Sequence, residues 1–307
     1  MPTAYITHPS CLMHDMGAYH PESPERLTAI GDGLSRAGLE GQLIHHIAGE
    51  ATRDQLERAH NADYIDDVEA ASPESGLHHI DPDTALNPHS VSAAKHAAGA
   101  VVLATDLVMQ GHASRAFCAV RPPGHHAESG RAMGFCIFNS VAVGARHALE
   151  AHGLDRVAIV DFDVHHGNGT EEIFTGDDRV LMVGTFQHPL YPYSGFNSTA
   201  PNMVNVPLAA GSGTEALRAA VNDRWLPALE AHAPQLIFIS AGFDAHREDP
   251  LAGLRFTEAD YAWVTRVLID VANRHANGRI VSSLEGGYNL SALGRSAAEH
   301  VRELIES

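Results

Sequence analysis

The 307-residue sequence predicts a single α/β domain with a mostly parallel central sheet of about eight strands flanked by helices. Strand-like and helical segments alternate along the chain, which is typical of βαβ units. Two strand-like segments, 157–160 and 236–240, are apolar throughout, as expected for parallel strands that are buried on both faces. No linker, repeat or low-complexity tract interrupts the alternation, so residues 1–307 form one predicted domain.

The individual elements follow from apolar periodicity and from capping residues. Strands are predicted at 4–7, 41–47, 115–120, 157–160, 180–185, 203–207, 236–240 and 280–284. Helices are predicted near 24–34, from residue 52, and at 90–110, 139–152, 214–231, 257–273 and 291–305. Thr52 and Thr257 each begin a pattern of the capping-box form, which supports the helix starts at these two positions.

Composition and charge exclude several classes of protein. A formal net charge of −18 argues against nucleic acid and anionic membrane as partners. No apolar run is expected to approach membrane-spanning length, and the first ten residues do not resemble a signal peptide. The three cysteines form no CxxC pair, which favours a reduced compartment, so we expect a cytoplasmic protein. The composition is compatible with a homo-oligomer.

Polar residues directly follow four of the predicted strands. These strand ends lie at 120–126, 160–168, 240–244 and 284–288, and they combine glycine with histidine, aspartate or tyrosine. In open α/β sheets ligands bind outside the carboxyl ends of the strands, so the four segments are expected to converge. Buried carboxylates are costly unless a cation or hydrogen bonds compensate them. The sequence therefore predicts a metal-dependent catalytic site at this edge of the sheet.

The candidate metal ligands follow from ligand chemistry. A catalytic zinc ion takes about three protein ligands and leaves one position open for water. Asp163 and His165 supply two ligands, because alternate residues of an extended segment share a face, and Asp244 is the natural third. Asp161 is better placed to hold a neighbouring imidazole, whereas His166 points the other way.

Candidates for proton transfer lie on the same strand ends. The adjacent His125 and His126 suit general base and general acid catalysis beside a metal-bound water. Asp161 and Asn168 are available as their partners; a carboxylate keeps an imidazole charged and an amide leaves it near neutral. Tyr288, on a Gly-Gly turn, can donate its hydroxyl to a developing oxyanion. This set predicts hydrolysis of a carbonyl compound without a Ser or Cys nucleophile.

Two further residues receive ordinary interpretations from the sequence alone. Arg26 lies in the first turn of the first predicted helix, where a surface position is favoured. Cys136 has no general base beside it in sequence, so we interpret it as a packed thiol.

Five motifs together resemble the histone deacetylase and acetylpolyamine amidohydrolase family, which has the arginase-deacetylase fold. The motifs are RPPGHHA, GFCIFN, DFDVHHGNGT, AGFD and LEGGYNL, and with HPESPERL near residue 20 they span nearly the whole chain. Asn168 and Glu285 within these motifs are similar to the class II branch, which includes bacterial histone deacetylase-like amidohydrolases. The resemblance implies one deacetylase catalytic domain over residues 1–307.

The resemblance also implies roles for the residues at the strand ends. It implies a zinc ion, or iron in the cell, on Asp163, His165 and Asp244. It implies His125–Asp161 and His126–Asn168 pairs, with His126 as the general base. Tyr288 would then polarise the acyl carbonyl.

Further implied roles concern the substrate. Phe135 and Tyr191 would wall a tunnel for the acyl-lysine stem, and Gly134 would offer its carbonyl to the substrate amide. Leu251 would stand where substrate selection occurs. Arg26 would line an internal acetate channel, which reverses its interpretation as a surface residue.

The sequence departs from the family pattern at two positions. Residues 184–186 are Gly-Thr-Phe where relatives often have Ser-x-His, so Gly184 lacks the hydroxyl of a usual potassium ligand, and a K⁺ site would rely on Asp161 and backbone carbonyls. Leu251 replaces a glutamate found in polyamine-selective relatives, which favours acyl-lysine. The resemblance would allow Asp81 or Asp83 to hold the substrate backbone, but the loop around them aligns loosely, so both are interpreted as surface acids.

The leading hypothesis is a zinc-dependent amidohydrolase that removes acetyl or other short acyl groups from acyl-lysine or similar acylated amines. The alternative within enzymes is an acetylpolyamine amidohydrolase. A binuclear ureohydrolase is disfavoured, because residues 165–168 offer no carboxylate to bridge a second metal. A catalytically silent acyl-lysine-binding protein is disfavoured, because neither the tyrosine nor a metal ligand is missing.

Overall fold

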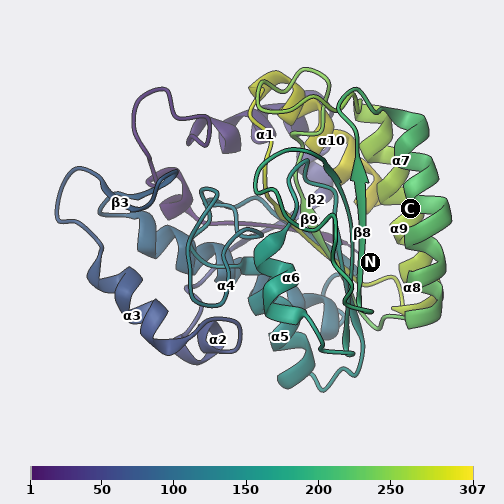
Figure 1. Ribbon diagram of the computed structural model, residues 1–307, viewed down its shortest axis with the longest axis horizontal. Coiled ribbons are helices and arrows are strands. Elements are labelled where there is room, and N and C mark those ends of the chain that lie inside the picture. Colours follow the sequence, from purple (N-terminus) through teal and green to yellow (C-terminus); the bar gives the residue numbers. More distant parts are fainter. Residues whose placement is uncertain (1, 307) are drawn as a thin grey trace.

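The computed structural model describes residues 2–306 and is organised around a central sheet with helices on both faces (Figure 1). Within these residues the sheet has eight strands in the order β2-β1-β5-β10-β9-β6-β7-β8, and all of its pairings are parallel. The strands are β1 (Thr3–Thr7), β2 (Leu43–Ile47), β5 (Arg115–Cys118), β6 (Val157–Asp161), β7 (Val180–Gln187), β8 (Met203–Leu208), β9 (Ile237–Ala241) and β10 (Ile280–Leu284). The predicted fold class and strand positions are confirmed.

The helices of the described residues cover this sheet in two layers. They are α1 (Glu25–Arg36), α2 (Arg53–Glu57), α3 (Ala62–Ala70), α4 (Ser90–Met109), α5 (Ser140–Glu150), α6 (Asn168–Phe174), α7 (Thr214–Ala220), α8 (Leu226–His232), α9 (Glu258–His275) and α10 (Leu290–Glu306). Helices α4 and α5 pack together on one face, and α1, α9 and α10 pack together on the other (Figure 1). Both faces of the strands are therefore buried, which explains their apolar runs.

Local sequence signals account for several helix ends. Thr52 and Thr257 form the predicted capping boxes, with their side chains and those of Gln55 and Asp260 exchanging hydrogen bonds with the backbone. The predicted helix 214–231 is found as α7 and α8 joined by a π-helical turn, whose Trp225 is fully buried.

Three elements were not predicted. Helix α3 carries its buried side chains in an otherwise acidic and polar segment, which weakens the apolar pattern. Helix α6 begins at Asn168, inside a glycine-containing stretch that reads as a loop. A small antiparallel hairpin is formed by β3 (His78–Asp81) and β4 (Thr84–Leu86) around an Asp-Pro-Asp turn, where no strand is predicted.

Helix α4 corrects one expectation from the sequence. Among the described helices it alone is long and apolar enough to cross a membrane by length and composition, with a mean hydropathy of 1.3 over its best window. However, 67% of that window is buried, and α4 packs on α5, β5, β1 and β10. The apolar residues of α4 are therefore explained by its packing in the core.

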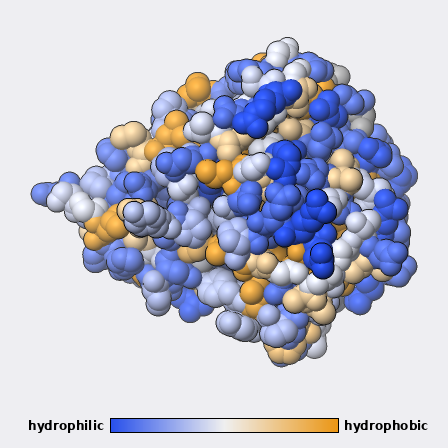
Figure 2. Space-filling model, turned by 90° about the horizontal axis from the view of Figure 1, so that it is seen from above, coloured by the Kyte–Doolittle hydropathy of each residue, from blue (hydrophilic) through white to orange (hydrophobic). Residues whose placement is uncertain are grey.

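The face drawn in Figure 2 is largely hydrophilic, with apolar residues in small separate patches.

The strand order explains how the site is assembled. Strands β5, β10, β9 and β6 are consecutive neighbours in the sheet, and they are the four strands whose ends carry the polar motifs. Their registers align Leu284 with Ala241 and Asp161 with Ser240. The segments that follow these strands therefore emerge side by side at one edge, as the sequence predicts.

Candidate functional site

A pocket of about 200 Å³ lies at the carboxyl edge of the sheet, where the four polar segments meet. Its lining combines the strand-end residues with residues of the β3–β4 turn, of the loop after β7, and of later parts of the loops after β5 and β9. The lining residues are Asp83, His126, Gly134, Phe135, His165, Leu190, Tyr191, Leu251 and Tyr288. The volume is small for a ligand site, so it suits a narrow linear group.

The side chains of Asp163, His165 and Asp244 converge at the base of this pocket. Their ligand atoms lie within 4.8 Å of one another. The Nδ1 atom of His165 is 3.0 Å from Asp163 Oδ1 and 3.2 Å from Asp244 Oδ2. Backbone N–H groups orient the two carboxylates. That of Gly286 donates to Asp163 Oδ2 at 2.8 Å, and that of Val164 donates to Asp244 Oδ1 at 2.9 Å. The arrangement has the donor set of a divalent metal site.

Charge and burial support this interpretation. Asp244 Oδ2 is buried and makes no well-aligned hydrogen bond among the described residues; its contact with His165 Nδ1, at 3.2 Å, is an ion pair only. Burial and the nearby Asp163 carboxylate raise the pKa of Asp244 to about 7. Burial alone would lower the pKa of His165, but the Asp163 and Asp244 carboxylates raise it to about 10. An orphaned buried carboxylate oxygen beside a second acid is costly, and a cation bound by all three groups would relieve that cost.

Gly286 is required by the close approach of backbone to this cluster. A Cβ atom at Gly286 would lie 2.0 Å from Asp244 Oδ2 and 2.6 Å from Asp163 Oδ2. Any side chain would therefore displace the candidate ligands, which explains the first glycine that follows Glu285 in the LEGGY motif.

His125 is held by an acid on each side. Its Nδ1 atom lies 2.9 Å from Asp161 Oδ2, and its backbone N–H donates to Glu285 Oε2 at 3.1 Å. Burial would lower the pKa of His125, but the carboxylates of Asp163 and Asp161 outweigh burial and raise it well above its ordinary value. His125 is therefore a protonated partner of Asp161.

His126 has a neutral partner instead. Asn168 Nδ2 donates to Glu128 Oε1 at 2.9 Å, which orients the amide so that its Oδ1 faces His126 Nδ1 at 2.7 Å. The Nδ1–H of His126 donates to this oxygen, and the neutral ring is left with an unprotonated Nε2. Burial, followed by the charges of His125 and His165, lowers the pKa of His126 well below its ordinary value.

Aromatic rings line the pocket above these groups. The rings of Phe135 and Tyr288 meet edge to face with centroids 5.9 Å apart, and Tyr191 meets His126 in the same way at 5.3 Å. Gly134 has a φ of 58°, and a Cβ there would lie 2.3 Å from His126 Cδ2, so a glycine is needed. Leu251 lies at the rim with 37% of its surface exposed.

The interpretation of Asp83 as a surface acid is wrong. Asp83 lines the pocket, and its Oδ1 accepts the backbone N–H of Gly134 at 2.9 Å. Thr84 Oγ1 accepts the next N–H, that of Phe135, at 3.1 Å. The turn of the β3–β4 hairpin therefore supports the strained Gly134–Phe135 turn, a long-range contact that the local sequence does not signal. Asp81 is partly buried in the same hairpin.

Arg26 is fully buried, so the surface position favoured by sequence alone is also wrong. Its guanidinium donates to Glu22 Oε1 at 3.0 Å and to the carbonyls of Glu285 and Gly287, and it lies 5.0 Å from the centre of the Tyr288 ring. Glu22 and the turn after β10 supply the partners that the burial of a cation requires. The acetate channel itself stays a prediction.

Cys136 and Gly184 lie next to the site without entering it. Cys136 is buried and its thiol donates to the carbonyl of Gly134 at 3.3 Å, in agreement with a packed thiol. Gly184 on β7 pairs with Asp161 on β6, and a Cβ there would lie 3.3 Å from the Asp161 carbonyl oxygen.

A second group of possible metal ligands occurs among the described residues, at the opposite edge of the sheet. It consists of Asp106, His147 and His152, near the end of α5 and the start of β6. Both Nε2 atoms point to Asp106 Oδ1, at 2.8 and 2.7 Å. Arg58 Nη1 donates to His147 Nδ1 at 2.8 Å, so the His147 Nε2 carries the proton and donates to Asp106. This group is a hydrogen-bonded cluster.

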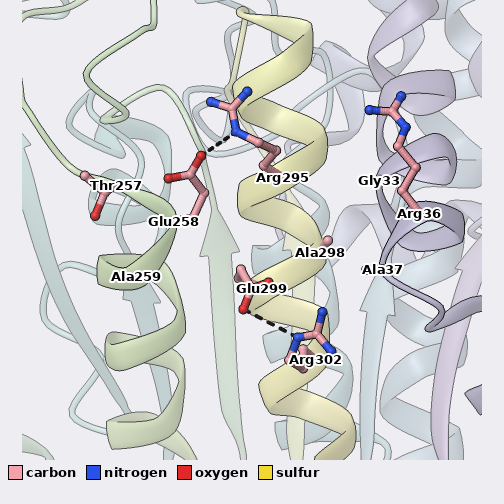
Figure 3. Close-up of a pocket in the computed structure, with 10 residues that line it drawn as sticks. All are labelled: Gly33, Arg36, Ala37, Thr257, Glu258, Ala259, Arg295, Ala298, Glu299 and Arg302. Carbon is pink, nitrogen blue, oxygen red and sulfur yellow. Dashed lines mark hydrogen bonds and ion pairs between the residues drawn. The ribbon is translucent and has the colours of Figure 1, made fainter.

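A larger groove of about 590 Å³ lies away from the pocket, on the outer surface of α1, α9 and α10 (Figure 3). Four of its charged side chains form two pairs, Glu258 with Arg295 and Glu299 with Arg302. None of the strand-end residues reaches this groove. Catalytic chemistry is therefore assigned to the smaller pocket.

Comparison with known proteins places this architecture in a family. The family profile described as "Histone deacetylase domain" matches residues 20–304. The chain is 36% identical to the "Histone deacetylase-like amidohydrolase" of Pseudomonas aeruginosa, over 94% of this chain and 82% of that protein. It is 34% identical to "Type-2 histone deacetylase 2" of Dictyostelium discoideum, over 99% of this chain but only 21% of that longer protein.

The comparison with solved structures agrees. The crystal structure of the HDA15 HD domain has a TM-score of 0.93 to this fold and 36% sequence identity, covering 99% of this chain and 88% of that one. The match extends over the whole sheet and the segments that follow its strands. The chain belongs to the histone deacetylase family, whose members are deacetylases and amidohydrolases.

Proposed function

We propose that this protein is a zinc-dependent deacetylase that removes acetyl or other short acyl groups from acyl-lysine or a similar acylated amine. One observation carries the proposal. Asp163, His165 and Asp244 bring ligand atoms within 4.8 Å of one another at the base of a narrow pocket, and His126 and Tyr288 line the same pocket. A metal site, a base and a hydroxyl donor thus face the space that a substrate would fill.

The residues of this chain divide the proton transfers between them. A divalent cation on the three ligands supplies Lewis acidity, which lowers the pKa of a water molecule and polarises the acyl oxygen. His126 accepts the proton that the water loses, because Asn168 holds its Nδ1–H and leaves Nε2 unprotonated. The same ring then donates this proton to the departing amine nitrogen. His125 remains the charged partner of Asp161 and keeps positive charge beside the reacting atoms.

Tyr288 and the pocket walls act on the substrate. The Tyr288 hydroxyl donates to the acyl oxygen as negative charge develops there, an interaction that is stronger in the transition state than in the ground state. Phe135 and Tyr191 hold the methylene stem between their rings. The Gly134 carbonyl accepts the N–H of the substrate amide, and its position is set by the hydrogen bond from the Gly134 N–H to Asp83.

The ligand set indicates which metals are suitable. One imidazole and two carboxylates suit zinc, and iron(II) accepts the same donors. We infer that zinc is the metal that supports activity, with iron(II) as an alternative in the cell. A potassium ion near Asp161 would bind without a side chain from position 184, because Gly184 has none.

Leu251 bears on the choice of substrate. The Leu251 side chain offers no partner to the second ammonium group of an acetylated polyamine, whereas it can contact the flank of an acyl-lysine peptide. This favours acyl-lysine, with acetylpolyamine as the alternative. The net charge of −18 is compatible with either cationic substrate.

The test is direct. Purified protein is assayed with a fluorogenic acetyl-lysine peptide and, in parallel, with acetylputrescine, each with and without a metal chelator. We expect chelator-sensitive turnover of the peptide that exceeds turnover of acetylputrescine. A large preference for acetylputrescine would reverse the order of the two substrates, and metal-replete protein that hydrolyses neither would contradict the proposed activity.

A further inference from the structure

Asp249 is a buried acid that the proposed reaction does not use. It lies in the loop after β9, five positions beyond Asp244, and only 7% of its surface is exposed. Its Oδ2 accepts the backbone N–H of Tyr288 at 2.7 Å and that of Asn289 at 3.3 Å. Its Oδ1 accepts the backbone N–H of Leu251 at 3.0 Å. One carboxylate therefore joins the loop after β9 to the loop after β10.

The Tyr288 backbone needs such an anchor. The residues before it are Gly286 and Gly287, and Gly287 has a φ of +121°, a conformation that other residues rarely adopt. Asp163 and Arg26 hydrogen-bond to the two glycines, but neither contact reaches the backbone N–H of Tyr288. After Tyr288, the Asn289 side chain caps α10 by accepting the Ala292 N–H at 3.0 Å. The Asp249 contacts fix the chain between the two glycines and this cap.

We propose that Asp249 is the positioning residue for Tyr288, and that the same carboxylate sets the position of Leu251 at the pocket rim. Through Tyr288, Asp249 places the hydroxyl that meets the acyl oxygen. Through Leu251, it places the side chain nearest to the substrate flank. The inference rests on the proposed deacetylase function and deepens it, because it links the catalytic tyrosine to the residue that selects the substrate.

The chemistry of Asp249 explains why a carboxylate is needed. Both oxygens accept hydrogen bonds from backbone N–H groups that lie on opposite sides of the side chain. An asparagine has the same shape, but its NH₂ group must face the N–H of either Leu251 or Tyr288, and two donors repel. The substitution Asp249→Asn therefore breaks one side of the anchor while the volume of the side chain is kept.

The neighbouring Glu248 provides a matched control. Its carboxylate is exposed and pairs with Arg295 at 2.9 Å, whereas Asn289 Nδ2 donates to the Glu248 backbone carbonyl, which substitution leaves in place. Glu248→Gln removes the same charge from the same loop without touching the anchor. We expect this variant to retain the wild-type rate.

The experiment is a double-mutant cycle with Asp249→Asn, Tyr288→Phe and the two combined, each checked for bound metal. We expect Asp249→Asn to lower kcat about ten- to a hundredfold. A misplaced Tyr288 hydroxyl still stabilises the transition state in part, so the loss is smaller than when the hydroxyl is removed. In the Tyr288→Phe background the same change should cost less than about threefold. An equal loss of kcat in both backgrounds would overturn the proposal, as would an Asp249→Asn enzyme with wild-type kcat.

A second readout does not depend on turnover. Hydrogen–deuterium exchange at the amides of residues 251, 288 and 289 should accelerate in Asp249→Asn relative to Glu248→Gln, while exchange in the sheet is unchanged. Unchanged exchange at all three amides would also overturn the anchor. If the wild-type protein hydrolyses no acylated amine, the proposed function fails on its own assay, and the exchange measurement still decides whether Asp249 holds these loops.

Discussion

Two clusters of aspartate and histidine lie at opposite edges of the same sheet, and they differ in their balance of hydrogen-bond donors and acceptors. At the amino edge, Asp106 faces His147 and His152, so one acid meets two bases. At the carboxyl edge, His165 faces Asp163 and Asp244, so one base meets two acids. The first cluster satisfies its own hydrogen bonds. The second leaves a buried carboxylate oxygen, Asp244 Oδ2, without a well-aligned hydrogen bond among the described residues.

The difference teaches how to recognise a metal site from side chains alone. Residue types and distances are similar in the two clusters, and neither criterion separates them. What separates them is the balance of donors and acceptors. An excess of buried acceptors needs a cation, whereas a balanced set is stable by itself.

The largest effect is expected from removing a ligand at the carboxyl edge. Asp244→Ala leaves two ligands, so it should abolish both metal retention and hydrolysis. Asp106→Ala, the matched change at the amino edge, should leave both intact apart from a modest loss of stability. Metal content by elemental analysis and peptide turnover measure both variants. Loss of metal from Asp106→Ala, with metal retained in Asp244→Ala, would reverse the assignment of the two clusters.

A smaller loss is expected when the metal ligands stay and only Tyr288 changes. Tyr288→Phe removes the hydroxyl but keeps the ring that packs against Phe135 and Arg26. The rate should fall about a hundred- to a thousandfold, mainly in kcat, because the lost hydrogen bond strengthens in the transition state. Steady-state kinetics on the metal-loaded variant measure the effect. Near-normal kcat would show that Tyr288 is only a packing aromatic and that the metal polarises the carbonyl by itself.

Glu22 is a third case, a buried acid whose charge is compensated by arginine side chains of the protein itself. Burial would raise the pKa of Glu22, but Arg121, then His14 and Arg26, hold it well below its usual value. Glu22→Gln leaves the buried guanidinium groups of Arg121 and Arg26 without their anionic partner, so the variant should unfold with a free energy lower by about 3–5 kcal/mol at pH 7. Denaturant unfolding measures this difference.

The pH dependence of that difference follows from the lowered pKa. The stabilisation by Glu22 is complete above the pKa of the unfolded state, about 4.5, and is lost as the pH falls through the lower pKa of the folded state. The gap between wild type and Glu22→Gln should therefore be constant near neutral pH and should narrow in acid. A gap that widens below pH 4.5 would contradict the ion-pair account.

The smallest effect is expected at the pocket rim, where the uncharged Leu251 lies. Leu251→Glu places a carboxylate where the second ammonium group of an acetylated polyamine would lie. One charge-assisted hydrogen bond is worth enough to improve kcat/KM for acetylspermidine relative to an acetyl-lysine peptide by about tenfold. Competition between the two substrates measures the ratio. A wild-type enzyme that already prefers acetylspermidine by a large factor would show that residue 251 does not set this choice.

Sequence reasoning recovered the parts of the molecule that depend on periodicity and chain order. The apolar strands 157–160 and 236–240 mark the centre of the sheet, and the polar residues after them had to emerge at one edge. The side chains of Asp163, His165 and Asp244 do converge there. Nothing more than strand-end position and ligand chemistry was needed for that expectation.

The errors occurred where a residue's partner lies far away in the sequence. Arg26 looks like a surface residue because its partners at Glu285 and Gly287 are about 260 positions away. Asp83 looks like a surface acid because its partner is the backbone of Gly134. Asp249 receives no role from the sequence, because its contacts with Tyr288 and Leu251 are invisible without the fold. Side chains that bond to backbone leave no mark in the pattern of residue types.

The most direct test of the central claim is a metal titration of the stripped protein. Chelator-treated enzyme is titrated with Zn²⁺ while hydrolysis of an acetyl-lysine peptide is followed. The carboxyl-edge cluster predicts that activity is absent without metal and saturates at one ion per chain, in wild type and in Asp106→Ala alike. Full activity in the stripped protein would contradict the account, as would saturation at two ions in wild type that becomes one in Asp106→Ala.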